Sequence, residues 1–320
     1  MVSRVQVLLA AVCFGTTGTA QALGPAASPA TVGASRIVVG ALLLALVAAV
    51  GLRGHAWRRP ALGPVALGGL AVAVYQVSFF AAVADTGVAV GTVVALGSAP
   101  ALAGGAAWLV DGERPGAGWA MATALAAAGV ACLALAGGGQ AEISLAGVAL
   151  ALVAGAGYAL MTLTSKRLLR GGTRPEEAMA LTFGTGAVLL TPVLALGDVA
   201  WLTSGDGLVL ALFLGAGPTA AAYVLFARGL RRLSAAETAT LTLAEPVTAA
   251  TLGALVLAER PGALAVGGIA LVLAGLVVLG AARERPRVAR PCGRVSVGER
   301  AGEAGAERLR PPVASEPAAA

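Results

Sequence analysis

The chain has 320 residues, of which 58% are hydrophobic and only 12% are charged, and its formal net charge is +6. Soluble domains carry about 25% charged residues, so this composition excludes an ordinary soluble protein and predicts a membrane protein. The single histidine, His55, and three widely spaced cysteines supply almost no ligands for a metal site, so we expect no metal, no other cofactor and no disulfide framework.

Ten apolar runs follow one another along the chain, each close to the roughly 20 residues that a helix needs to cross a bilayer. The predicted spans cover residues 5–23, 30–51, 63–84, 88–110, 117–136, 144–164, 178–197, 207–227, 235–257 and 262–281. The third and fourth spans are the hardest to separate, because only Asp85, Thr86 and Gly87 interrupt their apolar run. Residues 282–320 are rich in Arg, Glu, Pro and Ala without an apolar run, so we expect a disordered cytoplasmic tail there.

Basic residues alternate along the chain as the positive-inside rule requires. If the N-terminus is cytoplasmic, twelve Lys and Arg residues lie between spans on the inner side, and one, Arg260, lies in an outer loop. One span too many or too few would reverse every later loop, so the alternation supports ten spans. It predicts a multi-pass protein of the cell (inner) membrane with both termini cytoplasmic. Because the basic residues lie between spans and not on one soluble face, we expect no nucleic-acid partner.

Sliding the sequence against itself by 146 residues reveals an internal repeat. This offset places residues 113–117 on residues 259–263 with five identities in a row, ERPGA, and it places Pro100 on Pro246. Chance matches of small residues are common in a chain so rich in Ala and Gly, but a conserved distance between a mid-helix proline and this charged motif is not. We therefore interpret the match as a duplication.

The duplication divides the chain into a first five-helix repeat at residues 1–140 and a second at residues 141–281. Because five is an odd number, the second repeat must cross the membrane in the opposite sense to the first. Inverted repeats are the architecture by which many secondary transporters expose one site near the middle of the membrane alternately to each side. The predicted fold class is an all-α membrane protein whose ten transmembrane helices form two inverted five-helix repeats.

Two segments carry a resemblance to a known family: GSAPALAGGAAWLVDGERP at residues 97–115 and LAEPVTAATLGALVLAERP at residues 243–261. They resemble the Pro-containing helix of EamA-domain proteins in the drug/metabolite transporter (DMT) superfamily. Three further features that fit the pattern are Phe80-Ala81, Phe226-Ala227 and Arg36. The resemblance covers roughly residues 5–281, and it implies ten helices in two five-helix repeats.

Members of this family are similar to exporters of amino acids and other metabolites or drugs, so the resemblance implies efflux of a small-molecule substrate. Its motifs identify the fold and leave the substrate open. The first repeat departs from the second at two places. It has Asp111-Gly112 where the second has Leu257-Ala258, and it lacks an acidic residue before Pro100.

Two charged residues lie inside predicted spans and are candidates for substrate binding. Glu245 is near the middle of the ninth span, where an ionised carboxylate costs at least about 2.5 kcal/mol. It can bind a substrate amine or take up a proton, or it can be a structural carboxyl that is hydrogen-bonded to neighbouring helices. Arg36 can bind an anionic group, pair with Glu245, or extend to the membrane interface.

The other candidates are polar or helix-bending residues at membrane depth. Tyr75, Gln76, Tyr158 and Tyr223 are predicted to line a central cavity and bind substrate, although each type is also common in helix packing. Pro100 and Pro246 each remove a backbone hydrogen bond from a helix interior, so we expect kinks there that act in gating or line the cavity.

These observations predict a secondary active transporter that exports amino acids or related small metabolites or drugs by alternating access at the repeat interface. No nucleotide-binding P-loop occurs, so the energy should come from protons, another coupling ion or the substrate gradient. An enzyme is not expected, since no His/Asp/Glu cluster or G-x-S-x-G motif occurs. The alternatives are an integral membrane enzyme or a non-transporting membrane scaffold. The substrate, the coupling ion, the direction and the oligomeric state, monomer or homodimer, stay open.

Overall fold

The computed structural model describes residues 1–51, 60–136, 144–258 and 260–281. Outside the described residues lie His55, Cys292, the predicted tail at 282–320 and the predicted boundary between the repeats at 140 and 141. The tail and the boundary therefore stay predictions. Among the described residues every regular element is a helix, in agreement with the predicted fold class.

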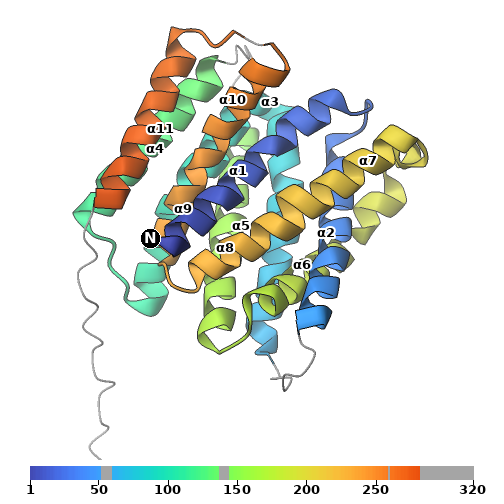
Figure 1. The fold of residues 1–320 in the computed structure, drawn as a ribbon, viewed down its shortest axis with the longest axis horizontal. Coiled ribbons are helices and arrows are strands. Elements are labelled where there is room, and N and C mark those ends of the chain that lie inside the picture. Colours follow the sequence, from blue (N-terminus) through green and yellow to red (C-terminus); the bar gives the residue numbers. More distant parts are fainter. Residues whose placement is uncertain (52–59, 137–143, 259, 282–320) are drawn as a thin grey trace, which may run out of the picture. The chain divides into compact units, whose positions relative to one another are not determined.

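The helices, shown in Figure 1, are α1 (Val2–Leu23), α2 (Pro29–Gly51), α3 (Leu62–Asp111), α4 (Ala117–Ala136), α5 (Leu145–Arg170), α6 (Pro175–Leu196), α7 (Gly205–Leu214), α8 (Ala222–Leu230), α9 (Ala235–Leu241), α10 (Glu245–Val256) and α11 (Ala263–Ala281). Three short segments of different pitch join some of them. They are the 3₁₀ turns η1 (Ala200–Thr203) and η3 (Thr242–Ala244) and the π-helical segment η2 (Gly215–Ala221).

Ten helical stretches in the described residues are long and apolar enough to cross a membrane, which confirms the predicted number of spans. The helix α3 supplies two of them, the segments α7, η2 and α8 form one, and the segments α9, η3 and α10 form another. The largest difference from the predicted ends is in α5, which continues to Arg170 and does not stop at residue 164. It can continue because the buried Lys166 finds hydrogen-bond acceptors inside the protein.

The third and fourth spans separate at Gly87, the position that the sequence marked only weakly. Gly87 has φ 79° and ψ 161°, a conformation that glycine adopts without the steric penalty of a Cβ atom. Just before it, the Thr86 hydroxyl donates to the carbonyl oxygen of Ala82, one turn earlier, at 2.8 Å. The interruption is therefore a feature of the backbone, and hydropathy alone locates it poorly.

Contacts between α4 and α11, which lie side by side in Figure 1, establish the direction of the two repeats. A Cβ atom on Gly129 would lie 2.6 Å from the carbonyl oxygen of Gly268. A Cβ atom on Gly275 would lie 2.7 Å from the carbonyl oxygen of Ala122. Under the offset of 146 residues, Gly129 corresponds to Gly275 and Gly268 corresponds to Ala122. The two contacts are therefore equivalent. Residue numbers rise along α4 while they fall along α11, so the equivalent helices are antiparallel and the repeats are inverted.

A second pair of glycine contacts shows the same exchange. A Cβ atom on Gly69 of α3 would lie 3.0 Å from the backbone nitrogen of Gly186 in α6. The equivalent Gly215, at the start of η2, would place its Cβ 3.1 Å from the backbone nitrogen of Gly40 in α2. Such close backbone approach is the form of helix association that membranes favour, because lipid gives apolar helices no hydrophobic drive to associate.

The backbone at the end of the fourth and ninth spans also repeats. Gly112 follows α3 with φ 68°, and the equivalent Ala258 has φ 57° after α10. A left-handed conformation costs an alanine roughly 1–2 kcal/mol, so its retention in the second repeat shows that the chain reversal before the Arg-Pro motif is needed in both.

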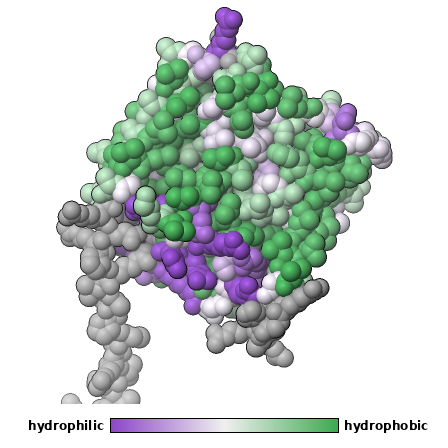
Figure 2. All heavy atoms as spheres, viewed as in Figure 1, coloured by the Kyte–Doolittle hydropathy of each residue, from purple (hydrophilic) through white to green (hydrophobic). Residues whose placement is uncertain are grey.

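The outer surface is apolar over most of the face shown in Figure 2, and hydrophilic side chains gather at the end where α8 leads into α9. Leu109, Leu196 and Leu255 are each more than three-quarters exposed. Soluble monomers rarely expose large contiguous apolar patches, whereas lipid solvates them. The protein is therefore a multi-pass membrane protein.

Candidate functional site

A small cavity lies between residues of the two repeats and has a volume of about 30 Å³. The first repeat lines it with Phe14, Arg36, Tyr75, Leu96 and Ala99, and the second with Tyr158, Tyr223, Ala239, Thr242, Leu243 and Glu245. Such a space holds only a few water molecules, because one water needs about 10–15 Å³ of this volume. The cavity must widen before it can hold a metabolite.

The structure brings together all six residues that the sequence nominated for substrate binding. Five of them, Arg36, Tyr75, Tyr158, Tyr223 and Glu245, line this cavity. The sixth, Gln76, lines a neighbouring cavity of about 10 Å³ together with four of the same residues. Their part in substrate binding stays a prediction.

Glu245 stands at a break in the ninth span. The helix α9 ends at Leu241, the 3₁₀ turn η3 follows, and α10 begins at Glu245. Pro246 occupies the first turn of α10, where a missing backbone N–H costs little. The Glu245 carboxylate makes no hydrogen bond or ion pair with the described residues. It faces the cavity without a bond to a neighbouring helix.

Thr242 is a cavity residue that the sequence reasoning missed. Its hydroxyl donates to the carbonyl oxygen of Ala239 at 2.8 Å, and it lies 3.0 Å from the hydroxyl of Tyr158. Because a threonine hydroxyl carries one proton, Tyr158 is the donor in the second bond. The bond ties α5 to the break that precedes Glu245. The adjacent Glu-Pro pair was the only signal in the sequence that pointed to this turn.

The two prolines differ in their surroundings. Pro246 follows the break at η3, whereas Pro100 lies inside α3, where the one non-helical residue is Gly87. The interruptions in the second half also include the π-helical segment η2 with Pro218, which the sequence reasoning did not consider. The gating role of Pro100 and Pro246 stays a prediction.

Arg36 turns toward Gln76 and makes no ion pair with Glu245. Its Nη2 atom donates to Gln76 Oε1 at 3.2 Å. The Nε atom of Arg36 is buried and has no hydrogen-bond partner among the described residues. The side chain therefore does not extend to the membrane interface, and pairing with Glu245, another of the expected alternatives, is not found in this conformation.

Aromatic rings form a connected group around the cavity. Tyr223 packs against Phe14 and Phe183, with ring centroids 4.9 and 4.2 Å apart, and Tyr158 lies 6.1 Å from Tyr75 and 6.3 Å from Phe226. Aromatic residues make up only 4% of the chain, so their concentration here gives the cavity an apolar wall beside its charged groups. Sequence periodicity did not indicate this grouping.

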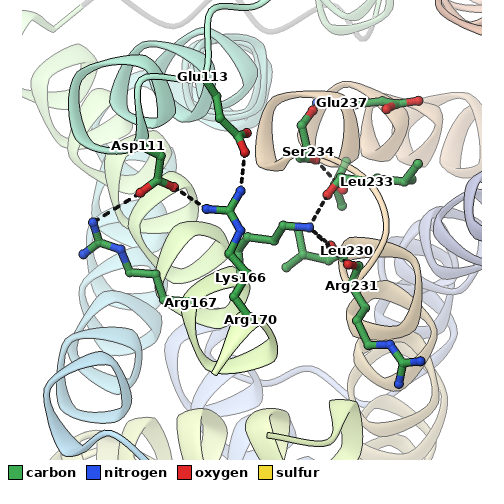
Figure 3. A network of polar contacts seen from close by, with 11 residues as sticks. Asp111, Glu113, Lys166, Arg167, Arg170, Leu230, Arg231, Leu233, Ser234 and Glu237 are labelled. Carbon is green, nitrogen blue, oxygen red and sulfur yellow. Dashed lines mark hydrogen bonds and ion pairs between the residues drawn. The ribbon is translucent and has the colours of Figure 1, made fainter. Parts of the chain in front are cut away.

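Charged side chains join α5 to neighbouring helices, as Figure 3 shows, near the turn where α8 leads into α9, and we call this region the charged end. Arg170 of α5 donates to Asp111 at 2.9 Å and also pairs with Glu113. The Nζ atom of Lys166 donates to the carbonyl oxygens of Leu230 and Leu233, each at 2.6 Å. These contacts connect α5 to the end of α3 and to the turn between α8 and α9.

Three further ion pairs join helices in the described residues, and one of them links Arg167 of α5 to Asp111 at 3.5 Å. Arg4 of α1 pairs with Glu237 of α9 at 2.7 Å, and Arg228 of α8 pairs with Glu176 of α6 at 2.5 Å. The sequence reasoning used these basic residues only to assign topology, because partners so distant in sequence cannot be recognised from spacing. Among the described residues, no group of three or more His, Cys, Asp and Glu side chains is placed to hold a metal ion.

Comparisons with known proteins agree with this architecture. Residues 4–135 and 145–281 each match the EamA-like transporter family. The uncharacterized transporter YwfM of Bacillus subtilis (strain 168) is 43% identical over 287 residues, covering 88% of this chain and 95% of that protein. A solved crystal structure, 22% identical, matches with a TM-score of 0.75 over 87% of this chain and 98% of the other, which shows the same fold. Since the family matches both repeats, this chain belongs to the EamA-like transporter family of the drug/metabolite transporter superfamily.

Proposed function

We propose that the protein is a secondary active transporter that exports amino acids or related small metabolites by alternating access at the interface of its repeats. The observation that carries this proposal is the cavity between the repeats, where an unpaired carboxylate, an arginine and aromatic rings face a common space. Rocking of two similar halves would open such a site to one side and then to the other.

The charged groups give the site a chemical preference. Glu245 offers an acceptor for a substrate ammonium or a proton, and Arg36 offers donors for an anionic group. A proton on Glu245 is the simplest form of ion coupling for this site, since binding of a cationic group and binding of a proton would exclude one another at one carboxylate. Proton-coupled exchange is therefore part of the proposal.

Flux measurements on purified protein in liposomes test the proposed function. Vesicles loaded with radiolabelled amino acids should release them unchanged, faster than protein-free vesicles, and a proton gradient should alter the rate. Release of a chemically altered product would support a membrane enzyme instead. Release no faster than from protein-free vesicles, for all amino acids and their amine analogues, would favour a non-transporting scaffold.

The proposed orientation places both termini and the charged end of Figure 3 in the cytoplasm, with the protein in the cell membrane. In a cysteine-free background, a cysteine at the exposed Ser204 should react with an impermeant thiol reagent added to whole cells. A cysteine at the exposed Gly171 should react only after the membrane is permeabilised. The reverse pattern would overturn the orientation.

A further inference from the structure

Arg36 and Gln76 lie beside the candidate site as a hydrogen-bonded pair. Arg36 Nη2 donates to Gln76 Oε1 at 3.2 Å. Both side chains line the smaller cavity, and that cavity shares the tyrosines Tyr75, Tyr158 and Tyr223 with the larger one that Glu245 lines. The pair is therefore next to the space that the proposed function assigns to the substrate.

Each member of the pair keeps a buried donor that has no partner. Arg36 Nε and Gln76 Nε2 are both buried and make no hydrogen bond with the described residues, and the Gln76 side chain is almost fully buried, with 3% exposed. A guanidinium only donates, so its partner on Gln76 must be Oε1, and this bond leaves the amide NH₂ free. Buried donors without a partner are rare in native proteins, so these two indicate a missing acceptor.

The backbone of α2 is shaped to keep the Gln76 amide in this place. A Cβ atom on Gly33 would lie 1.8 Å from Gln76 Nε2 and 2.3 Å from a ring carbon of Phe80. Gly33 is three residues before Arg36 on the same helix, so both residues lie on one face of α2. One face of α2 therefore carries the charged donor, Arg36, and leaves room at Gly33 for the neutral donor, the amide of Gln76.

We infer that Arg36 and Gln76 form a subsite for a carboxylate group of the transported solute, an inference that rests on the proposed function. A carboxylate supplies acceptors only, and arginine binds it in a planar arrangement with charge-assisted hydrogen bonds. The two groups of the subsite without a partner, Arg36 Nε and Gln76 Nε2, are both donors, and Gln76 Oε1 already accepts from Arg36. A solute that carries only a cationic group gains nothing from it.

Glu245 gives the larger cavity a group that can bind the cationic part of the same solute. Its carboxylate lines the larger cavity without an ion pair to Arg36, so the two charges remain available to different parts of one solute. The aromatic group around Tyr223 and Phe14 offers an apolar surface for a side chain. A zwitterion with an ammonium, a carboxylate and an apolar side chain can bind Glu245, the Arg36–Gln76 pair and the aromatic surface at the same time.

Equilibrium binding of matched probes to the purified full chain tests the subsite. The probes are L-leucine and L-phenylalanine, with their decarboxylated counterparts 3-methylbutylamine and 2-phenylethylamine. The wild type should bind each amino acid at least about 10-fold more tightly than its amine. Arg36→Gln should weaken amino-acid binding roughly 10- to 100-fold and Gln76→Met roughly 3- to 10-fold, while either change alters amine binding less than about 3-fold.

Two controls keep the test decisive. Arg36→Lys should restore part of the amino-acid affinity because it keeps the charge, and Arg232→Gln should leave both affinities unchanged because Arg232 is exposed and outside both cavities. If Arg36→Gln fails to fold, Gln76→Met carries the comparison by itself.

Equal weakening of amino acids and amines, or equal binding of both by the wild type, would overturn the carboxylate subsite. Flux of these solutes in liposomes distinguishes this failure from failure of the proposed function. Flux without preference for the carboxylate rejects only the subsite. Carboxylate-selective binding that depends on Arg36, with no flux, supports the subsite and rejects transport.

Discussion

The Glu245→Gln variant is expected to export amino acids about 100-fold more slowly than the wild type, or more slowly still, while it remains folded in detergent. Glutamine has nearly the same size as glutamate, so the 3₁₀ turn η3 and the first turn of α10 should be preserved. The variant loses only the charge and the ability to take up a proton. Because an amide does not titrate, any pH dependence that a proton on Glu245 confers on the flux should disappear with it.

The measurement is efflux from liposomes at several pH values, with protein folding checked by size-exclusion chromatography. Asp206→Asn is a matched control, because Asp206 is an exposed acidic residue in the first turn of α7, outside the cavity. It should leave the flux unchanged. Unchanged flux with unchanged pH dependence in Glu245→Gln would remove this carboxylate from the mechanism.

The Lys166→Met variant is expected to loosen the charged end of the protein. Lys166 is 4% exposed, and its ammonium donates to three backbone carbonyl oxygens in the turn between α8 and α9. Methionine preserves the apolar stem and leaves these buried acceptors without their charged donor. Loss of such bonds costs about 2–5 kcal/mol, which favours conformations in which α5 and this turn separate.

Hydrogen–deuterium exchange at residues 228–238 measures this effect. Exchange there should be at least about 10-fold faster in Lys166→Met than in the wild type, since 1.4 kcal/mol corresponds to a factor of ten. Arg232→Met removes the same charge from an exposed position in the same turn and should leave the exchange unchanged. Equal protection in Lys166→Met and the wild type would mean that these bonds do not hold the turn in place.

The charged end bears on the proposed alternating access, because the repeat does not reproduce most of its contacts. The offset of 146 residues pairs Lys166 with Ala20, Arg170 with Gly24 and Asp111 with Leu257. The counterparts of these three residues are therefore small or apolar, whereas Glu113 has an identical counterpart in Glu259. If the halves exchange conformations in the proposed cycle, one end closes through ion pairs and hydrogen bonds. Among the described residues the other end has hydrogen bonds, such as Ser144 to Asp85 and Trp201 to Thr31, but no ion pair. Lys166→Met should consequently alter the balance between the two states of the proposed cycle.

Several features of the fold could be predicted from the sequence because the membrane imposes them. A spanning helix must be about 20 apolar residues long, since unpaired backbone groups are too costly in lipid. Breaks in hydropathy therefore located the ten spans, although Gly87 and the extension of α5 to Arg170 depend on local conformation and on buried acceptors. The duplication was visible because the ERPGA motif and the mid-helix prolines occur in both copies.

The candidate site was predicted in part. A charge inside an apolar span is conspicuous, so Glu245 and Arg36 could be nominated without coordinates. Their relation could not, because helices that are apolar on all sides give no hydropathy signal for how they are rotated. For the same reason the sequence did not indicate that Thr242 and the phenylalanines around Tyr223 lie at the cavity, or that the Gln76 amide keeps a donor without a partner.

The sequence by itself determined the class of protein, the number of spans, the duplication and its inverted sense, because each follows from hydropathy, charge and internal identity along one chain. The tertiary structure alone decided that Arg36 bonds to Gln76 instead of Glu245 and that Lys166 holds the α8–α9 turn. These pairings join helices far apart in sequence, and close glycine contacts such as Gly129 with Gly268 determine how those helices meet.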